Sequence, residues 1–296
     1  MPSVWKPWYV FRPRQLAVRI ARGLSGKPGD RVTVPMPWGS VLTVNPNETI
    51  GSSVWTTGIY DIAVSELLYR LLPIGGHALD AGANIGYMTN LMATKSGKSG
   101  TVHAFEPHPV VGQRLRDNVA ALPKARTATV QVHPVALSDK PGTAKLVLPE
   151  NFADNEGIGY LASDASDASA QGYDVPTMTL DGLFPSGRFD VMKMDVEGHE
   201  ASVLRGATRL LHEHAIRHIV FEEHDGPASE PCKILQAAGY TLFQVGWHLR
   251  GLILADLSAP RVCKTYEAPS YLATLEPSDA VQAAKPSGWQ IFGHRS

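Results

Sequence analysis

From His77 onward, short apolar runs alternate with stretches of helical periodicity, and this alternation constrains the fold more than any other feature of the sequence. Strands that are joined by helices pair in parallel, and helices cover both faces of the resulting sheet. We therefore expect an α/β chain with a doubly wound sheet of about seven strands. The runs are HALDAG, TVHAFEP, VQVHPVAL, FDVMKMD and HIVFEEH, which start at His77, Thr101, Val130, Phe189 and His218.

Three patterns predict elements that flank this sheet. RVTVPM and SVLTVN alternate apolar with small or polar residues around Pro37-Trp38-Gly39, which indicates a β-hairpin. Apolar residues recur on one face of residues 61–72, and Pro73 ends that helix. YTLFQVG and LILADL, separated by residues 247–251, predict a second hairpin that closes one edge of the sheet with antiparallel strands.

Length and hydrophobic content indicate one main domain with short additions. The 296 residues are 44% hydrophobic, which is enough for one full core. We assign residues 41–258 to this domain, and residues 259–296 to a C-terminal tail of little pattern. Residues 1–40 form a basic and aromatic extension with a short helix and the start of the hairpin. Residues 151–171 are rich in Ala, Ser, Asp and Gly, so we expect a mobile loop there, either a substrate lid or a disordered segment.

The balance of charges excludes several classes of partner. Lys and Arg total 27 against 28 Asp and Glu, so no global field favours nucleic acid or an anionic membrane, and a small-molecule partner fits better. In the basic stretch 5–31 we expect a solvated helix, with a weak interfacial or protein contact as the alternative. No run of about 18 apolar residues occurs, so no transmembrane segment is expected. Two isolated cysteines provide neither a disulfide framework nor zinc ligands, which favours a cytoplasmic location.

The segment LDAGANIGYMT, residues 79–89, combines the end of an apolar strand with a tight turn that opens a helix. Gly82, Ala83 and Gly86 remove side-chain bulk, so a ligand can approach the backbone and the free N–H groups of the helix. The spacing is GxxxG and not the GxGxxG of dinucleotide sites, and Asp80 before the turn opposes a pyrophosphate but suits a cationic amino group. We expect a ligand site that is not for NAD; a glycine turn without any ligand is the alternative.

Residues at the ends of the next two runs strengthen this interpretation. Glu106 lies 26 residues after Asp80 and can accept both hydrogen bonds of a ribose diol. Ala136 and Leu137 end the third run, at the level where small apolar groups can sandwich a purine. Together these features predict a site for a nucleoside.

Charged and histidine side chains follow the fourth and fifth runs. Asp195, Glu197 and His199 come at the end of the fourth run, where carboxylates need a partner or a function. His224 ends the fifth run and is the residue type most easily poised as a general base near neutral pH. Two alternatives stay open, because Glu197 also suits a helix N-terminus and His224 could be an ordinary surface residue.

In this order the motifs resemble the FkbM-type family of S-adenosylmethionine-dependent methyltransferases, over roughly residues 41–245. The resemblance implies a class I, Rossmann-like methyltransferase fold whose last strand is antiparallel, with S-adenosyl-L-methionine as cofactor. It further implies methylation of oxygen, often on sugars or natural products, with carboxyl acceptors as an alternative. The matching motifs are GIYDIAVSELL, LDAGANIGYMT, HAFEPHP, the Asn155-Glu156-Gly157 loop, TLDGLF, DVMKMDVEGHEASVLRGA and IVFEEH.

The resemblance also assigns residues to the parts of the site. The glycine turn with Asp80 would line the methionine moiety, Glu106 would hold the ribose, and Asp195 would face the reaction centre. The two residues that end the third run would lie near the adenine. The expected cofactor-binding residues are therefore Tyr60, Asp80, Gly82, Ala83, Asn84, Gly86, Glu106, Pro107, Ala136, Leu137 and Asp195. The expected substrate contacts are Asn155 and Glu223.

Methyl transfer from a sulfonium is an in-line displacement, so the position of the acceptor oxygen matters most and a base only removes the hydroxyl proton. We expect His224 as this base, with Glu197 or His199 as substitutes; a carboxylate acceptor would need none. More distant alternatives are a catalytically inactive cofactor-binding partner protein and an NAD-dependent oxidoreductase. A metal-assisted methyltransferase stays open as an alternative, because the acids and the histidine at the last two strand ends could supply ligands. Their spacing is not diagnostic, however, and we assign no metal-binding residue. The oligomeric state stays open, a homodimer included.

Overall fold

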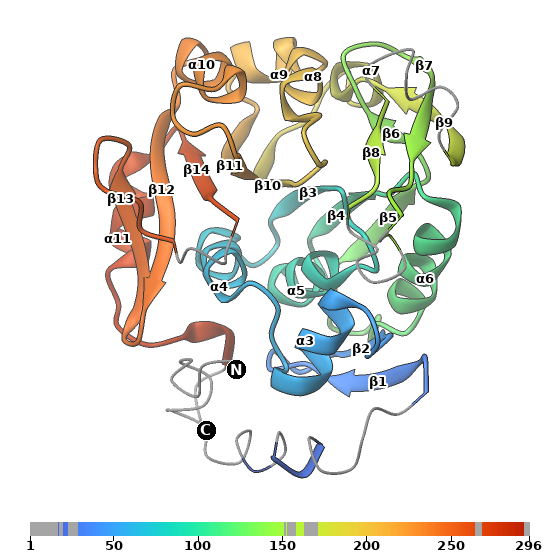
Figure 1. Cartoon of the computed structure of the whole chain (residues 1–296). Coiled ribbons are helices and arrows are strands. Elements are labelled where there is room, and N and C mark those ends of the chain that lie inside the picture. The colour runs from blue at the N-terminus through green and yellow to red at the C-terminus, as the bar shows by residue number, and fades with distance from the viewer. Residues whose placement is uncertain are drawn as a thin grey trace.

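The computed structural model describes residues 17, 20–22, 29–150, 152, 158–162, 171–263 and 268–292. At its centre lies an eight-stranded sheet of mixed direction, with helices on both faces (Figure 1). The expected doubly wound α/β fold is confirmed. In spatial order the strands are β13 (Gly251–Asp256), β12 (Thr241–His248), β14 (Ser270–Thr274), β11 (Ile216–Glu222), β10 (Phe189–Met194), β3 (His77–Ala81), β4 (Thr101–Phe105) and β5 (Thr129–His133).

The five apolar runs from His77 onward form the neighbouring parallel strands β11, β10, β3, β4 and β5. Chain order and spatial order diverge at β3, because β10 returns to the side of β3 that β4 and β5 do not occupy. In open α/β sheets, ligands bind at such a reversal, outside the carboxyl ends of the strands. The fold thus places the turn after β3 where a ligand site is expected.

The strand β14 comes from the segment 259–296, which the sequence assigns to a tail. It pairs antiparallel with both β11 and β12, and its Leu272 lies opposite Val220 on one side and Phe243 on the other. The strand has five residues, all buried, so it shows no alternation that the sequence could reveal. The tail assignment is therefore corrected: this segment supplies part of the sheet, and the predicted edge hairpin of β12 and β13 lies beyond it.

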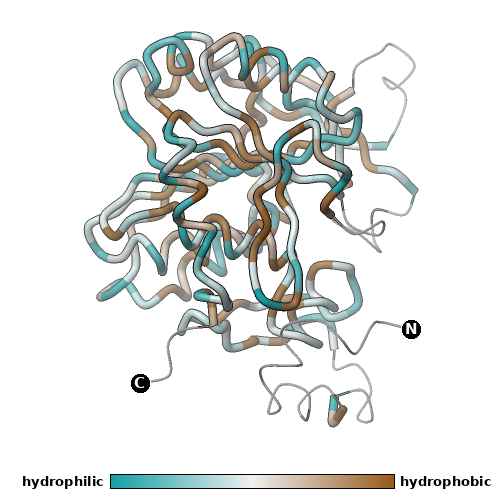
Figure 2. The backbone as a smooth tube through the Cα atoms, turned by 90° about the vertical axis from the view of Figure 1, so that its left-hand side faces the viewer, coloured by the Kyte–Doolittle hydropathy of each residue, from teal (hydrophilic) through white to brown (hydrophobic). Residues whose placement is uncertain are grey.

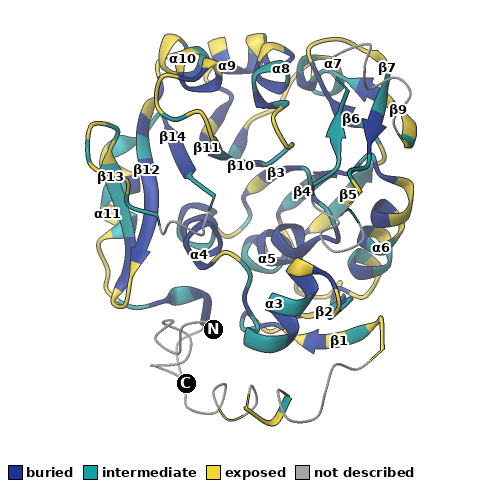
Figure 3. Ribbon diagram, viewed as in Figure 1, coloured by how far each residue is buried: buried dark blue, intermediate teal, exposed yellow. Residues whose placement is uncertain are grey.

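Helices pack on the sheet through two large apolar cores, one on each face. Hydrophobic stretches run along the central strands (Figure 2), and the same strands are buried while the outer sides of the helices are exposed (Figure 3). The helices of one face are α3 (Thr49–Thr57), α4 (Ile62–Leu71), α5 (Tyr87–Ser96), α6 (Pro109–Ala120), α11 (Pro277–Ala284) and the 3-10 helix η2 (Gln290–Phe292). Those of the other face are α7 (Leu180–Leu183), α8 (Glu200–Arg205), α9 (Thr208–His212) and α10 (Glu230–Ala237).

A smaller four-stranded sheet follows β5 in the chain. Its spatial order is β6 (Ala136–Leu137), β9 (Gly172–Met178), β7 (Gly142–Val147) and β8 (Tyr160–Leu161). The strand β8 lies inside the segment that the sequence predicts as a loop, and it pairs antiparallel with β7. Two residues are too few for a periodicity to show. Most of the remaining predicted loop, and most of the basic stretch 5–31, lie outside the described residues.

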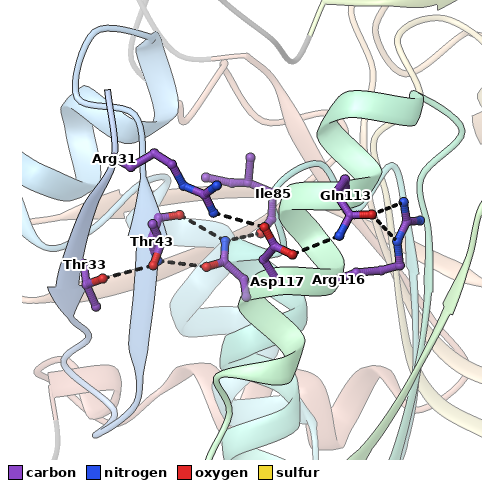
Figure 4. Close-up of polar contacts among 8 residues, drawn as sticks. Arg31, Thr33, Thr43, Ile85, Gln113, Arg116 and Asp117 are labelled. Carbon is purple, nitrogen blue, oxygen red and sulfur yellow. Dashed lines mark hydrogen bonds and ion pairs between the residues drawn. The ribbon is translucent and has the colours of Figure 1, made fainter. Parts of the chain in front are cut away.

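The predicted N-terminal hairpin, β1 (Val32–Pro35) and β2 (Val41–Val44), is confirmed, and it braces the turn after β3. The side-chain oxygen of Asn118 accepts from Thr43 N at 2.9 Å, and the side-chain amide donates to Thr43 O at 3.0 Å. The same amide donates to the carbonyl oxygen of Ile85 at 2.8 Å (Figure 4). One side chain of α6 therefore joins the hairpin to the turn.

A buried ion pair in α4 holds the C-terminal segment against the core. Arg70 donates from Nε to Glu66 Oε1 at 2.5 Å, and both side chains are almost fully buried. Glu66 also accepts from the backbone N–H groups of Gln290 and Ile291. Arg70 donates to four carbonyl oxygens between residues 283 and 288. The last described residues are thus tied to α4.

Arg70→Met should lower the free energy of unfolding by about 3–5 kcal/mol, because it leaves the buried Glu66 carboxylate without its cation. Urea unfolding followed by circular dichroism measures this loss. Arg205→Met is the matched control, since Arg205 pairs with Glu230 in an exposed position and such pairs contribute little. Equally small losses in the two variants would contradict this role of the buried pair.

Candidate functional site

A cavity of about 390 Å³ lies at the carboxyl ends of β3, β4, β10 and β11. Its wall combines the turn after β3, the residues that follow β4 and β10, the end of β11, the start of α4 and one side of the smaller sheet. The strand order reverses here, which is the expected place for a ligand. Nine of the predicted cofactor-binding residues line it: Tyr60, Gly82, Ala83, Asn84, Glu106, Pro107, Ala136, Leu137 and Asp195.

The turn after β3 approaches its neighbours so closely that only glycine fits at two positions. Gly82 has φ 73°, and a Cβ there would lie 1.8 Å from Asp195 O. Gly86 has φ 89°, and a Cβ there would lie 2.6 Å from a side-chain carbon of Leu115. Gly86 does not line the cavity. Its expected place beside the methionine moiety is therefore corrected: Gly86 allows α5 to pack closely against α6.

Asp80 departs most from its expected place. Its side chain is fully buried and does not line the cavity. The Oδ2 atom accepts from Thr89 Oγ1 at 2.5 Å, and Oδ1 lies 3.8 Å from Lys193 Nζ. Burial raises the pKa of Asp80, and the charge of Lys193 opposes this shift. The expected contact with a cationic amino group is therefore corrected: Asp80 supports the turn from behind.

Lys193 of β10 connects Asp80 to the cavity. Its Nζ donates to Gly82 O at 2.8 Å and lies 3.3 Å from Asp195 Oδ2. Burial disfavours the charged lysine, but Asp195 and Asp80 outweigh it and raise the pKa of Lys193. One ammonium thus holds both the carbonyl of the turn and a carboxylate of the cavity wall. The sequence assigns Lys193 no role, although a charge deep in a strand pattern is a signal for one.

Glu106 lies at the end of β4 with its carboxylate on the cavity wall. The Oε2 atom accepts from Asn84 N and the Oε1 atom from His108 N, each at 2.9 Å. A carboxylate oxygen can accept more than one hydrogen bond, so both atoms can still receive the hydroxyls of a ribose diol. Burial raises the pKa of Glu106 to about 7, although the two backbone donors oppose this shift.

Apolar side chains enclose the part of the cavity next to Glu106. Ala136 and Leu137 of β6 are buried and line it, as the sequence predicts for a purine site. On the side of the smaller sheet, Phe152 lines the cavity and stacks on His108, with 4.9 Å between ring centroids. This end of the cavity therefore suits a flat, mostly apolar group.

Two of the three candidate bases, His199 and Glu197, line the cavity after β10. His199 Nε2 lies 2.9 Å from Ser138 Oγ, at the end of β6, and burial lowers the pKa of His199. Partial burial, followed by the charges of Asp195 and Glu200, raises the pKa of Glu197 to about 7. His199 is thus hydrogen-bonded to Ser138 beside the apolar end of the cavity, whereas Glu197 lies close to Asp195.

At the end of β11, alternate side chains face opposite sides. Glu222 and His224 line the cavity, and Glu222 Oε1 lies 2.7 Å from His224 Nε2. Glu223 is buried, does not line the cavity and accepts from Asp225 N at 2.7 Å. The expected substrate contact at Glu223 is therefore corrected, because successive residues of a strand point to opposite faces. The other expected substrate contact, Asn155, lies outside the described residues.

Four acids line the cavity together with Tyr60. Burial and then four neighbouring acids raise the pKa of Tyr60, so this hydroxyl stays protonated. Burial and the other acids also raise the pKa of Glu222. Asp61 is not predicted from the sequence, although an Asp directly before a helix is an N-cap signal, and its Oδ1 accepts from Val64 N at 3.1 Å. The four acids are Asp61, Asp195, Glu197 and Glu222.

Within the described ranges, no group of three or more His, Cys, Asp or Glu side chains is arranged to hold a metal ion. In the same part of the chain, no helix combines the length and the apolar character that are needed to cross a membrane.

The family model described as the methyltransferase FkbM domain matches residues 80–242. This chain belongs to the FkbM methyltransferase family. It is 30% identical over 160 residues to the hexuronic acid methyltransferase AglP of Haloferax volcanii, and the match covers 50% of this chain and 55% of that protein. It is 31% identical over 201 residues to the 31-O-demethyl-FK506 methyltransferase FkbM of Streptomyces tacrolimicus, covering 57% and 74%. The match thus spans about half the length of AglP.

Solved methyltransferase structures that align with this FkbM-family chain share little sequence with it. An O-methyltransferase from Thermotoga maritima has 16% identity and a TM-score of 0.40, covering 86% of this chain and 96% of that chain. A tRNA (uracil-54, C5)-methyltransferase from Pyrococcus abyssi has 11% identity and a TM-score of 0.42, covering 83% and 44%.

S-adenosylmethionine is the methyl donor of this family, and the cavity residues fit it. The turn offers backbone without side-chain bulk at Gly82 and Ala83, next to acids that suit a cationic ligand. Glu106 offers carboxylate oxygens for a ribose diol. Ala136 and Leu137 offer apolar walls for a purine.

Binding of S-adenosylhomocysteine should weaken as the pH falls through about 7, because protonated Glu106 loses capacity to accept hydrogen bonds from the ribose. The ionised Glu106 carboxylate binds the ribose better, so S-adenosylhomocysteine binds tightly above this pKa and weakly below it. We expect roughly tenfold weaker binding at pH 6 than at pH 8. Calorimetric titration measures both values. Glu106→Gln should bind weakly at both, and the same pH dependence in this variant would contradict the role of Glu106.

Asp80→Asn should destabilise the cofactor-free protein by about 1–3 kcal/mol, because buried Lys193 loses one of the two carboxylates that offset its burial. The amide keeps an oxygen for Thr89, so the change isolates the charge. Urea unfolding of the cofactor-free form provides the measurement. If Asp80 contacted the cofactor directly, Asp80→Asn would instead leave the stability of the cofactor-free protein unchanged and abolish cofactor binding.

Proposed function

We propose that this chain transfers a methyl group from S-adenosylmethionine to a hydroxyl oxygen of a small molecule, such as a sugar or a natural product. The proposal rests on Glu222 and His224, which pair at 2.7 Å on the wall of the cavity that also contains Glu106. Two relatives support this class of acceptor, since one is named for a hexuronic acid and the other for 31-O-demethyl-FK506.

When bound, the cofactor supplies a methyl group that its positive sulfur already activates, so the chain has to position the acceptor oxygen and remove its proton. If His224 donates from Nε2 to Glu222, its other ring nitrogen, Nδ1, is left to accept this proton. A carboxylate in this arrangement fixes the orientation and the tautomer of the imidazole ring. We therefore assign His224 as the base and Glu222 as its positioning residue.

Glu197 is the second candidate for the base. Its pKa of about 7 makes it an effective proton acceptor near neutral pH, and it lines the same end of the cavity. His199 is the weaker candidate, because Ser138 already engages its Nε2 and burial lowers its pKa.

A hydroxyl acceptor suits the site better than a carboxylate acceptor. A carboxylate would have to approach the methyl group beside Asp195 and Glu222, and like charges oppose one another strongly in a partly buried cavity. The family match gives no support to an NAD-dependent oxidoreductase. Measured turnover decides between an enzyme and an inactive cofactor-binding partner.

We also retain the prediction of a cytoplasmic location, and the oligomeric state stays open, a homodimer included. The location is supported by Cys232 and Cys263, which are both free. Asn155 likewise stays a predicted substrate contact.

His224→Ala should lower the formation of S-adenosylhomocysteine from a panel of hydroxyl acceptors by about 10²–10⁴-fold, the usual contribution of a general base. Its calorimetric affinity for S-adenosylhomocysteine should stay within about twofold, because the ring is not needed to hold the cofactor. The control is His212→Ala, which removes an exposed histidine of α9 outside the cavity. Equal losses of turnover and of cofactor affinity would count against His224 as the base.

A further inference from the structure

The cavity wall next to Glu222 contains a serine to which the sequence assigns no role. Ser270 is the first residue of β14 and lies directly opposite Glu222 of β11. Residues that face each other across an antiparallel pair project to the same side of the sheet. Four residues along the same ladder, His218 Nδ1 lies 2.8 Å from Thr274 Oγ1, so opposite side chains of these two strands meet. Ser270 and Glu222 accordingly both line the cavity.

The hydroxyl of Ser270 has no protein partner within the described part of the chain. Ser270 is only 9% exposed, and its hydroxyl makes no hydrogen bond to a described residue. Buried hydroxyls are normally hydrogen-bonded, because a group that loses its water without gaining a partner costs free energy. The other buried serines among the described residues all follow this rule, namely Ser40, Ser65, Ser96, Ser138 and Ser229. Ser270 is thus the exception, and it borders the cavity.

This hydroxyl lies beside the two residues to which the proposed function assigns the acceptor. Glu222 Oε1 lies 2.7 Å from His224 Nε2, so Ser270 flanks the residue that orients the base. The Cβ atoms of directly opposite residues in an antiparallel pair are about 4.5–5.5 Å apart. A ligand that meets His224 with one hydroxyl can therefore reach Ser270 with a neighbouring hydroxyl of the same molecule.

Apolar and aromatic groups line the cavity near these two strands. Tyr60 precedes α4 and Val64 belongs to it, and α4 packs against β11. Ala268, two residues before Ser270, lines the cavity as well. Polar groups on one wall and apolar surface around them suit a ring that carries hydroxyls on its edge, as sugar rings do.

We propose that Ser270 binds the acceptor: it hydrogen-bonds a second hydroxyl while His224 meets the hydroxyl that is methylated. The inference rests on the proposed function, because it concerns the acceptor of the same site. It narrows the acceptor to compounds with two neighbouring hydroxyls, such as sugar rings, in preference to molecules with a single hydroxyl. A serine hydroxyl fits such a partner, since both groups can donate and accept a hydrogen bond.

Binding of two small alcohols to the protein saturated with S-adenosylhomocysteine tests this role without any turnover. The vicinal trans-cyclohexanediol carries a second hydroxyl next to the first, whereas cyclohexanol carries one only. In Ser270→Ala the affinity for the diol should fall by about threefold to tenfold, the usual contribution of one hydrogen bond, and the affinity for cyclohexanol should change by less than about twofold. Titrations followed by nuclear magnetic resonance measure both affinities.

The control variant is Ser258→Ala, which removes an exposed hydroxyl outside the cavity and should leave both affinities unchanged. The alanine at position 270 should not disturb folding, because the hydroxyl that it removes is bonded to no described residue. The ratio of the two affinities compares two ligands on one protein, so a general loss of stability cancels. A ratio that Ser270→Ala leaves unchanged, or a diol that does not bind the unmodified protein, would overturn the inference.

Turnover of a sugar separates this inference from the proposed function. Methyl glucoside carries neighbouring hydroxyls on its ring, and in Ser270→Ala its kcat/KM should fall by about threefold to tenfold, mainly through a higher KM. An unchanged kcat/KM would overturn the role of Ser270 while leaving hydroxyl methylation intact. If methyl glucoside does not react with the unmodified protein, the proposed function fails for this sugar, and the binding of the diol decides the inference alone.

Discussion

One buried ammonium organises the site. Lys193 reaches from β10 to the carbonyl oxygen of Gly82 and lies between the carboxylates of Asp80 and Asp195. A buried charge is tolerated only when carboxylates and hydrogen bonds replace the water it has lost. Lys193 therefore needs both acids, and Asp80 needs Lys193 and Thr89. The same interaction thus holds both the turn after β3 and the Asp195 carboxylate on the cavity wall.

The rest of the fold keeps these groups in place. The strands β3 and β10 are neighbours because the chain returns across the sheet after β5, and this return also creates the cavity. Asn118 joins the N-terminal hairpin to the turn through Ile85. Glu66 and Arg70 fasten the C-terminal segment to α4, whose first turn is capped by Asp61 of the cavity wall. Both ends of the described domain therefore support the site.

The sequence predicts positions at the site better than it predicts orientations. Parallel strands end at one edge of a sheet, so the places of Glu106 and Asp195 follow from the order of the apolar runs. Asp80 lies in a strand that is buried on both faces, and no exposed face is left to show which way it points. Glu222 and Glu223 are distinguished only by the register of β11, which depends on its pairing partners. One of these partners, β14, is itself too short and too buried to be predicted.

A crystal structure of this chain with bound S-adenosylhomocysteine tests the central claim most directly. The ribose hydroxyls should lie within hydrogen-bond distance of Glu106, and the purine should pack against Ala136 and Leu137. The sulfur should face Asp195 and the pair formed by Glu222 and His224. A ligand that binds in the reverse direction, with its purine beside Asp195 and Glu222, or one that binds outside the cavity, would contradict these roles of Glu106, Ala136 and Leu137.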